Sequence, residues 1–547
     1  MENSNNKIVR LSRSHTVKAI LLFFFVIIVF AAGFSKIEGL DFFNSIYWAI
    51  TTSSTVGYGD FAPTTTLGKI LTMFTMFSGI GLLGYILSQV SNHIISYNMK
   101  NIMGIAKSNK KDHTIILAWN VVAKNAIQEL IQEENDIVVV DESSQPEINT
   151  YPKTQFILGV LNEPKTLIRA GIRDAKQIIL TMPKDSKVIL GISLIRKLNS
   201  KILIIGRIGN IDFSNVAYAA GCNRVVSPSE VGGNLIYSAL VEPSVVKWVS
   251  EVTTQEHGAS LSELNIKYNS QYVGKKIKEI KFYKNTLVTA ISRGSKIESV
   301  PDENYILTSD DTLILVQKDK SVKGLDRIHK TDGKTLNGLV LICGWNHTLR
   351  STINELLNTE KIIVLANNIE KGEKRHYKDL GVKFFEGEVN KFNLIKADVS
   401  KVSTVILGMR DDSDVILMSY MVKELNPGVN LITRIDEATN NSAAYTAGTN
   451  HIVSPSEIGG RLLAHSIKYP MAVNWIMGIT TLSIGAKIKE IKVIKNKKYI
   501  GKKISELELP KNTQLVGLDE DSNSVVESLP NKNYVLKKSD TLVVVQK

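Results

Sequence analysis

The segment Thr51-Thr52-Ser53-Ser54-Thr55-Val56-Gly57-Tyr58-Gly59-Asp60 determines how this 547-residue chain is interpreted. In its second half, two glycines alternate with larger residues. Glycine adopts, at little steric cost, backbone angles that strain other residues. Such angles let successive carbonyl groups point toward one axis. We therefore expect residues 55–59 to form a non-helical segment lined with backbone oxygens.

Apolar segments surround this stretch on both sides. A short amphipathic helix is expected from Phe42 to Ser54, and the apolar runs Ala19 to Phe34 and Ile70 to Val90 approach the ~20 residues that span a bilayer. Non-helical backbone at membrane depth is tolerated only where it lines a cavity or is buried in protein. The pattern therefore predicts two membrane helices with a re-entrant pore loop between them. A glycine turn in a soluble protein and a signal peptide are the competing interpretations, and the flanking segments disfavour both.

Residues 55–59 read Thr-Val-Gly-Tyr-Gly, the selectivity-filter motif of potassium channels, which we recognise rather than derive. The resemblance implies that rings of oxygen atoms replace the hydration shell of a K⁺ ion. These oxygens come from the carbonyls of Thr55, Val56, Gly57 and Tyr58 and the Thr55 hydroxyl, and Gly59 completes the filter. One chain supplies one wall of such a pore, so a homotetramer is implied.

The resemblance also assigns residues that support the filter. Tyr47 and Trp48 match the aromatic cuff of the family, and Asp60 is expected to hydrogen-bond to Tyr47 behind the filter. In the second span, Gly79 and Gly84 correspond to a gating hinge. Glycine weakens a helix interior by roughly 0.5–1 kcal/mol relative to alanine. Close packing of small residues between membrane helices is the alternative interpretation of these glycines.

The bulk composition limits the choice of partners and compartment. The net charge is +13 with a pI near 9.3, yet the lysines are scattered and no nucleic-acid-binding motif is present. Basic residues flank the outer ends of the two apolar runs, so the lipid bilayer of the cell membrane is expected, with both termini in the cytoplasm. Cys222 and Cys343 fall at expected core positions and are interpreted as reduced packing residues.

The remainder of the chain is repeated. Ser227-Pro228-Ser229-Glu230 recurs as Ser454-Pro455-Ser456-Glu457 at an offset of 227 residues. Each copy opens with short apolar runs separated by helical segments, the βαβ pattern of a doubly wound parallel sheet, and ends in a small β-rich lobe. The expected domains are a pore domain (1–95), a linker (96–112), a Rossmann-like N-lobe and C-lobe in copy one (113–250, 251–330), and the same pair in copy two (331–475, 476–547).

Taken together, the chain resembles a prokaryotic two-transmembrane potassium channel with two tandem RCK domains, the regulators of K⁺ conductance. The resemblance implies a ligand-gated channel whose four chains form a cytosolic ring of eight RCK lobes. No catalytic His, Lys or Tyr constellation accompanies the sheets, so we expect no enzyme. A regulatory RCK subunit of another K⁺ transport system and a membrane-tethered NAD-binding oxidoreductase are the alternatives.

Nucleotide binding stays open at this point. A dinucleotide site typically has the motif Gly-x-Gly-x-x-Gly after the first strand, because the pyrophosphate must approach the helix N-terminus. Neither copy keeps it: copy one has no glycine there, and copy two has only Gly344. The ribose-binding acid at the end of the second strand is Asp141 in copy one and is replaced by Asn367 in copy two. A regulatory nucleotide such as NAD and a vestigial fold that binds none are both compatible with this pattern.

Regulation by Ca²⁺ or another divalent ion is the second option that the resemblance implies. Asp185 matches an acid of calcium-gated relatives in copy one, but Arg207 and Gly209 replace its companions. In copy two, acids follow the third, fourth and fifth strands, where oxygen ligands are expected to converge at the sheet edge: Glu386, Glu388, Asp412 and Asp436. Solvated loop acids and helix caps are the alternative, and Arg434 is expected to pair with some of them.

Overall fold

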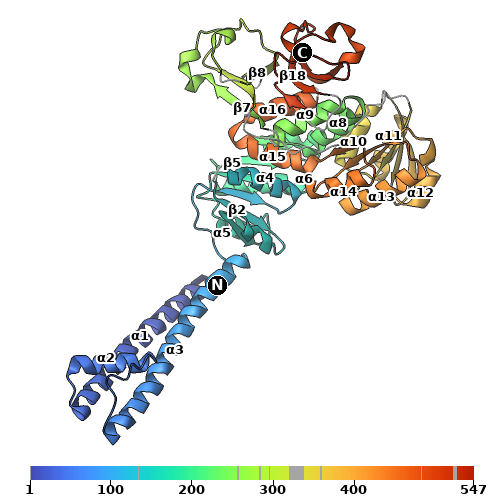
Figure 1. Cartoon of the computed structure of the whole chain (residues 1–547). Helices are drawn as coiled ribbons and strands as arrows, with labels where there is room; N and C mark the ends of the chain where they lie inside the picture. Colours follow the sequence, from blue (N-terminus) through green and yellow to red (C-terminus); the bar gives the residue numbers. More distant parts are fainter. Residues whose placement is uncertain are drawn as a thin grey trace. The chain divides into compact units, whose positions relative to one another are not determined.

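The structure is a computed structural model that describes residues 2–132, 135–254, 258–282, 285–294, 296–318, 338–357, 360–481, 483–520 and 526–547. The chain divides into two compact units, Met1–Ala106 and Lys107–Lys547 (Figure 1). Each unit is described separately below.

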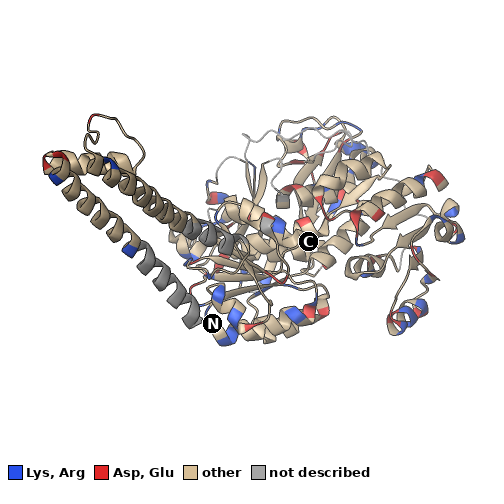
Figure 2. Cartoon of the chain, turned by 90° about the horizontal axis from the view of Figure 1, so that it is seen from below, with Lys and Arg blue, Asp and Glu red and all other residues tan. Residues whose placement is uncertain are grey.

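The first unit contains three helices: α1 (Glu2–Glu38), α2 (Phe42–Ser53) and α3 (Thr66–Ile102). Within the long helices, Val17–Glu38 and Thr66–Ser91 are long and apolar enough to cross a membrane, with mean hydropathies of 2.7 and 1.9. Both expected spans lie inside these segments, and Figure 2 shows few charged residues along them. Both helices extend beyond the apolar runs, because polar residues also adopt the helical conformation. Helix α3 therefore extends past the domain boundary expected at residue 95.

A small aromatic core holds the pore helix α2 against α1. The rings of Phe34 and Trp48 are stacked with their centroids 3.5 Å apart, and Ile27, Ala31 and Ala49 complete this buried cluster. The Asp41 carboxylate caps α2 by accepting from the Asn44 backbone N–H at 3.1 Å. Such a cap satisfies a donor that the first helical turn leaves free.

The second unit holds two copies of a parallel six-stranded sheet. The strand orders are β3-β2-β1-β4-β5-β6 and β13-β12-β11-β14-β15-β16, so both sheets are doubly wound as the sequence predicts. The sixth strands are additional to the five that the apolar runs indicate, because three residues are too short for a clear pattern. The strands are β1 (Thr114–Leu117), β2 (Ile137–Asp141), β3 (Thr154–Leu158), β4 (Gln177–Leu180), β5 (Leu203–Arg207), β6 (Arg224–Val226), β11 (Leu339–Cys343), β12 (Lys361–Ala366), β13 (Lys383–Glu386), β14 (Thr404–Leu407), β15 (Asn430–Arg434) and β16 (His451–Val453).

Helices separate these strands and follow the last one in each copy. In copy one they are α4 (Val121–Gln132), α5 (Pro164–Arg169), α6 (Asp185–Leu198), α7 (Ser214–Ala219), α8 (Pro228–Val241) and α9 (Pro243–Thr254). In copy two they are α10 (His347–Leu356), α11 (Lys371–Asp379), α12 (Lys391–Lys396), α13 (Asp412–Leu425), α14 (Asn441–Thr446), α15 (Pro455–Lys468) and α16 (Pro470–Thr480).

Each copy ends in a four-stranded antiparallel C-lobe with the same strand order, β7-β10-β8-β9 and β17-β20-β18-β19. The strands are β7 (Ala259–Asn265), β8 (Thr286–Arg293), β9 (Lys296–Ser299), β10 (Asp311–Lys318), β17 (Lys487–Lys492), β18 (Thr513–Asp519), β19 (Glu527–Ser528) and β20 (Thr541–Gln546). The buried Trp248 of α9 donates through Nε1 to the Val516 carbonyl at 3.1 Å, and the buried Trp475 of α16 donates to Ser299 Oγ at 3.0 Å. Each of these helices therefore holds the C-lobe of the other copy.

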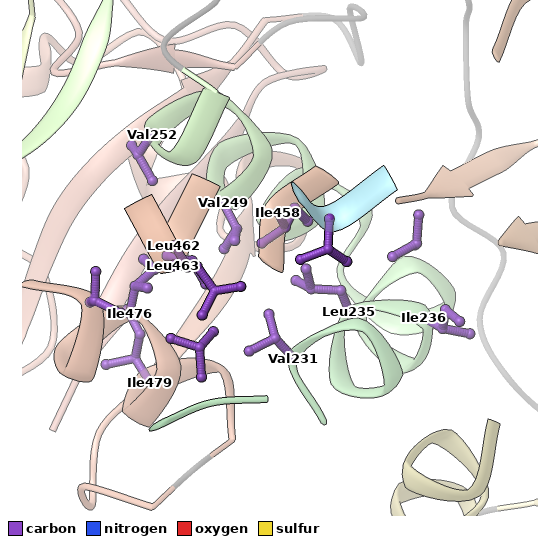
Figure 3. Close-up of a cluster of buried hydrophobic side chains, with 14 of the residues drawn as sticks. Val231, Leu235, Ile236, Val249, Val252, Ile458, Leu462, Leu463, Ile476 and Ile479 are labelled. Carbon is purple, nitrogen blue, oxygen red and sulfur yellow. The ribbon is translucent and has the colours of Figure 1, made fainter. Parts of the chain in front are cut away.

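This exchange explains why α9 and α16 run past the expected boundaries at residues 250 and 475. Helices α8, α9, α15 and α16 share one apolar core, whose side chains Figure 3 draws. A Cβ built on Gly232 would lie 2.4 Å from Pro455 Cγ, and one on Gly459 would lie 2.3 Å from Pro228 Cγ. The repeated Ser-Pro-Ser-Glu segments thus start two helices that pack reciprocally on each other, and the glycines permit their close approach.

Candidate pore and regulatory cleft

The filter segment leaves the end of α2 with the backbone angles that its motif predicts. Gly57 and Gly59 have positive φ values of 49° and 81°, and Thr55 has one of 64°. The backbone N–H groups of Val56 and Gly57 both donate to the Thr51 carbonyl, at 3.0 and 3.2 Å. The left-handed angle at Thr55 was not expected, since a threonine adopts it only with strain. Val56 and Tyr58 are largely exposed in the single chain.

The two aromatic residues of the expected cuff lie in different surroundings. The Tyr47 hydroxyl hydrogen-bonds to the Asp60 carboxylate, and its ring is parallel to that of Tyr58 with centroids 6.5 Å apart. Trp48 is buried against Phe34 of α1 instead. Tyr47 and Asp60 are thus brought together beside the filter, whereas Trp48 anchors the pore helix to the outer helix.

The segment directly before α3 is held by the carboxylate of Glu38. The sequence alone indicated no structural role for this residue. Glu38 accepts from the backbone N–H groups of Thr64 and Thr65, both at 3.0 Å, and from their hydroxyls at 2.6 and 2.7 Å. Thr65 Oγ1 in turn accepts from the Gly68 N–H at 3.0 Å. The end of α1 therefore fixes the linker between the filter and α3.

The two glycines of the expected hinge differ in their contacts. A Cβ on Gly79 would lie 2.5 Å from both Cβ and Oγ of Ser53, at the end of the pore helix. A Cβ on Gly84 would meet nothing within 4 Å in the chain. Helix α3 is continuous through both positions. The geometry at Gly79 favours close packing of α3 against the pore helix, which is the alternative interpretation of this residue.

In copy one, a cavity of about 520 Å³ lies at the carboxyl ends of the strands, where ligands bind in such sheets. Residues after β1, β2, β4 and β5 line it. The Asp141 carboxylate accepts from the backbone N–H groups of Trp119 and Ser143 at 2.7 and 2.8 Å. Ala118 has a φ of +81°, an angle that glycine adopts more easily.

The N-terminus of α4 is already capped in this cleft. Asn120 Oδ1 accepts from the Ala123 N–H at 3.1 Å, and its Nδ2 donates to the Thr181 carbonyl at 2.8 Å. A pyrophosphate would need the donors of that first turn. The missing glycines and this cap together disfavour the usual dinucleotide geometry in copy one.

The corresponding region of copy two carries bulkier residues. Gly344 has a φ of +109°, and Asn346 caps α10 by accepting from the Leu349 N–H at 3.0 Å. Arg350 pairs with Glu373 at 2.8 Å and contacts the ring of His347. Asn367, which replaces the ribose-binding acid, is exposed. Copy two thus places its own side chains at the mouth of its cleft.

The acids expected to form a metal site are not brought together. β13 lies three strands from β14 in the sheet, a separation of about 14 Å, so Glu386 and Glu388 cannot join Asp412. The expectation failed because it used the order of the strands along the chain, which is not their order in space. Glu386 pairs with Lys374 at 2.6 Å, which lowers its pKa, and Glu388 is exposed.

The remaining acids are already engaged by backbone groups. Asp185 accepts from the N–H groups of Gly209 and Asn210 at 2.7 and 2.9 Å. Asp412 accepts in the same way from those of Asp436 and Glu437, at 3.0 and 2.9 Å. In the part of the chain that the structure describes, no group of three His, Cys, Asp or Glu side chains is placed to hold a metal ion.

Arg434 does pair with one of these acids. Its guanidinium lies 2.5 Å from Asp436, which also accepts from Ser456 Oγ at 2.8 Å, while burial raises the Asp436 pKa. Both Arg434 and Asp436 line the copy-one cleft, although they belong to copy two. That cleft is therefore built from both copies.

Comparisons with known proteins agree with this division of the chain. An ion channel family model matches residues 18–96, a TrkA-N domain model matches residues 114–228 and 340–455, and a TrkA-C domain model matches residues 261–330. Probable potassium channel protein 2 of Methanocaldococcus jannaschii is 28% identical over 57% of this chain and 95% of its own. The calcium-gated potassium channel TvoK of Thermoplasma volcanium is 27% identical over 51% of this chain and 83% of its own.

Solved structures show the same fold. The GsuK channel bound to NAD superposes with a TM-score of 0.54 at 17% identity, covering 97% of each chain. The human SLO3 gating ring superposes with a TM-score of 0.55 at 14% identity, covering 79% of this chain and 99% of its own.

Proposed function

Because the chain belongs to the prokaryotic potassium channels that join a membrane pore domain to RCK domains, we propose that it forms a K⁺-selective pore gated by a ligand on those domains. The observation that carries the proposal is the backbone of Thr55 to Gly59, with left-handed angles at three positions behind a short buried helix. In this proposal its carbonyls replace the water around K⁺.

Four copies complete the pore in this proposal. The outward-facing filter side chains of a single chain leave surfaces for the other three. The N-lobe of copy one also exposes apolar side chains on α6, on α7 and in the turn before α7, namely Leu190, Ile211, Phe213, Val216 and Tyr218. Exposed apolar groups of this extent are typical of protein contacts. We assign them to a second copy, so that four chains with two RCK copies each form a ring of eight lobes.

In this proposal α1 and α3 cross the membrane, and the lobes lie in the cytoplasm and serve as the sensor. Ligand binding changes the geometry of the ring and pulls on the segment that joins α3 to β1. This requires the ligand to bind the open and closed states with different affinity. The NAD in the GsuK structure and the gating of TvoK by calcium make a nucleotide and Ca²⁺ the two ligand classes to test. The proposal gives the lobes no catalytic role, and turnover of NAD would contradict that.

K⁺ flux from liposomes that hold the reconstituted protein tests the pore. We expect Gly57→Ala to abolish the flux, because a side chain strains the backbone at a φ of +49°. Gly428→Ala is the matched control, since its Cβ would meet nothing within 4 Å and its φ is ordinary. Both variants are checked for the tetramer by size-exclusion chromatography. Unchanged flux in a tetrameric Gly57→Ala protein would contradict the proposed filter, and a tetrameric unmodified protein that gives no flux would favour a regulatory subunit of another transport system.

A further inference from the structure

The C-lobe of copy two begins with a segment that is much richer in lysine than its counterpart in copy one. Residues 487–503 contain eight lysines and one acid, whereas the equivalent residues 260–276 contain three lysines and one acid. The two segments have the same structure, because β17 pairs with β20 as β7 pairs with β10, and two 3₁₀ turns follow each strand. The fold therefore does not require the additional positive charge.

Half of these lysines line a cavity of about 480 Å³. They lie on β17 and on the two turns that follow it, and they are Lys489, Lys492, Lys495 and Lys498. The cavity is also bounded by Val241 and Glu242, at the end of α8 in copy one, and by Val544 and Gln546 of β20. Pockets of this volume hold small molecules. An occupant of this cavity therefore contacts both copies of the domain.

Copy one has a neutral residue at each of these four positions. Lys489 lies opposite Val544 in the pairing of β17 with β20, and Ser262 lies opposite Leu315 in the same pairing of β7 with β10. At this register the neutral counterparts of the four lysines are Ser262, Asn265, Tyr268 and Gln271. The additional charge is thus concentrated around one cavity of one copy, which indicates a binding role for these lysines.

The protein itself does not neutralise the lysines of this cavity. None of the four forms an ion pair in the part of the chain that the structure describes. Lys489 is half-buried and lies close to Lys487, and burial and this neighbour lower the pKa of its ammonium group. Like charges that are held together repel each other, and an anion placed between them removes this repulsion.

Two carboxyl groups also line the cavity, and both are engaged by backbone groups. Glu490 accepts from the backbone N–H of Ser244 near the start of α9, and Glu242 accepts from the backbone N–H of Glu490. Burial raises the pKa of Glu242 to about 7, so this group is only partly ionised at neutral pH. Lys489 and Lys492 act on these acids through their charge without forming an ion pair with them. Four ammonium groups therefore face fewer than two negative charges, and the cavity attracts anions.

We propose that this cavity in the C-lobe of copy two binds a small anion with several linked phosphate groups. Lysine binds phosphate as a point charge, and the four ammonium groups are spread along one strand and two turns. A chain of phosphates carries its charges at successive positions and meets several of these groups at once, whereas a single phosphate does not. Free polyphosphate and the phosphate chain of a nucleotide offer the same chemistry. The inference concerns binding alone and does not depend on the proposed pore.

Isothermal titration calorimetry on the full-length protein in detergent, with tripolyphosphate, ATP and inorganic phosphate as probes, tests this site. We expect Lys489→Ser and Lys492→Asn each to weaken tripolyphosphate binding by roughly 3- to 10-fold, because each removes a charge that contacts the ligand. Adding Lys495→Tyr and Lys498→Gln to these two changes should abolish binding. All four substitutions introduce the residue that copy one has at the same position, so the fold accommodates them. Inorganic phosphate should bind more weakly than tripolyphosphate.

The matched control is Lys497→Ser. It also introduces the copy-one residue, Ser270, and it removes the same charge from the same segment. Lys497 is exposed and does not line the cavity. Tripolyphosphate binding should therefore remain unchanged in this variant, and thermal unfolding of each variant checks that the lobes stay folded.

The outcomes separate the two sources of the phosphate chain and can overturn the proposal. If the cavity variants weaken the binding of both probes, tighter binding of ATP identifies a nucleotide, and tighter binding of tripolyphosphate identifies free polyphosphate; both uphold the site. Equal losses of affinity in Lys489→Ser and Lys497→Ser would show a diffuse attraction to the lysine-rich segment and would overturn it. Unchanged tripolyphosphate binding in the fourfold variant, or no binding of any probe at millimolar concentration, would also overturn it.

Discussion

The two copies of the repeated domain have the same strand order but differ at their clefts. In copy one, α4 starts with Val121, and the cleft opens toward Arg434 and Asp436 of the other copy. In copy two, α10 starts with His347, and a Cβ at Gly209 of copy one would lie 3.3 Å from its ring. The fold that both copies share therefore does not fix the residues that line each cleft. A few side chains at the ends of equivalent strands make the two clefts different.

The interfaces between the copies differ in the same way. Glu129 of α4 pairs with Arg461 and His465 of α15, and Glu129 and His465 are buried. At the equivalent positions of the α10–α8 interface lie Glu355 and Asn234, with no ion pair between them among the described residues. One interface is thus held by charge and the other mainly by apolar packing. The predictions below test how far this difference extends.

The largest expected effect comes from two tryptophans that occupy equivalent positions in the two copies. Trp248→Ala and Trp475→Ala each remove a fully buried indole that holds the C-lobe of the other copy. Each should destabilise the lobes by about 3–5 kcal/mol, because a large cavity remains. Thermal unfolding of the full-length protein, with hydrogen exchange in β18 and β9, measures this. A large effect from only one of the two would show that the C-lobes are not held equivalently.

The second prediction tests the charged interface. Glu129→Gln should destabilise the lobes by about 3 kcal/mol, since it leaves the half-buried Arg461 and the buried His465 with less compensation. Glu355→Gln is the matched control. It should be neutral or slightly stabilising, because burial raises the pKa of Glu355 and no described residue forms an ion pair with it. Equal losses of thermal stability in the two variants would remove the distinction between the interfaces.

The third prediction concerns pH. Burial raises the pKa of Glu251 on α9 to about 7 from an ordinary 4.5, and the equivalent residue of α16 is Gly478. The folded state therefore keeps a proton that the unfolded state loses. The contribution of this protonation to the free energy of unfolding is fully present below pH 4.5 and is lost as the pH rises through 7. Glu251→Gln should remove about 1–3 kcal/mol of this pH dependence.

Hydrogen exchange in α9 and α16 between pH 6 and 8 measures this effect after correction for intrinsic rates. We expect α9 of the unmodified protein to lose protection as the pH rises and α16 to lose less. Glu251→Gln should make α9 resemble α16. Loss of protection in α9 that is unaffected by the substitution would assign the pH dependence to another group.

The smallest expected effect concerns an ion pair between the copies. Lys124 of α4 lies 3.1 Å from Glu437 of copy two, and both side chains are about one-third exposed. Its counterpart Arg350 pairs with Glu373 inside copy two. A double-mutant cycle with Lys124→Ala and Glu437→Ala should give a coupling of about 0.2–1 kcal/mol. A coupling well above this range would mean that the pair is shielded from solvent in the assembled protein.

The sequence predicted the elements better than their arrangement. Apolar runs located five strands of each sheet, and the repeated Ser-Pro-Ser-Glu segments revealed the duplication. The exchange of C-lobes was not predictable, because Trp248 and Trp475 look like ordinary core residues in either arrangement. The filter was recognised from its motif, but the left-handed angle at Thr55 and the clamp at Glu38 depend on contacts between segments distant in sequence.

The ligand sites show the same limit more sharply. Carboxylates at the ends of strands suggested a metal site, yet the strand order separates Glu386 from Asp412. In the sequence, Arg207 was interpreted only as a residue that replaces one of the acids expected in a calcium site. Arg207 lines the same cleft as Arg434 of the other copy, and that position follows from the packing of the two copies.

The reversal potential of the reconstituted protein in a planar bilayer, with K⁺ on one side and Na⁺ on the other, tests the central claim most directly. A reversal near the K⁺ equilibrium potential is the result that the filter geometry predicts. A current that reverses near zero, or a stable tetramer that conducts no K⁺ with either nucleotide or Ca²⁺ present, would contradict it.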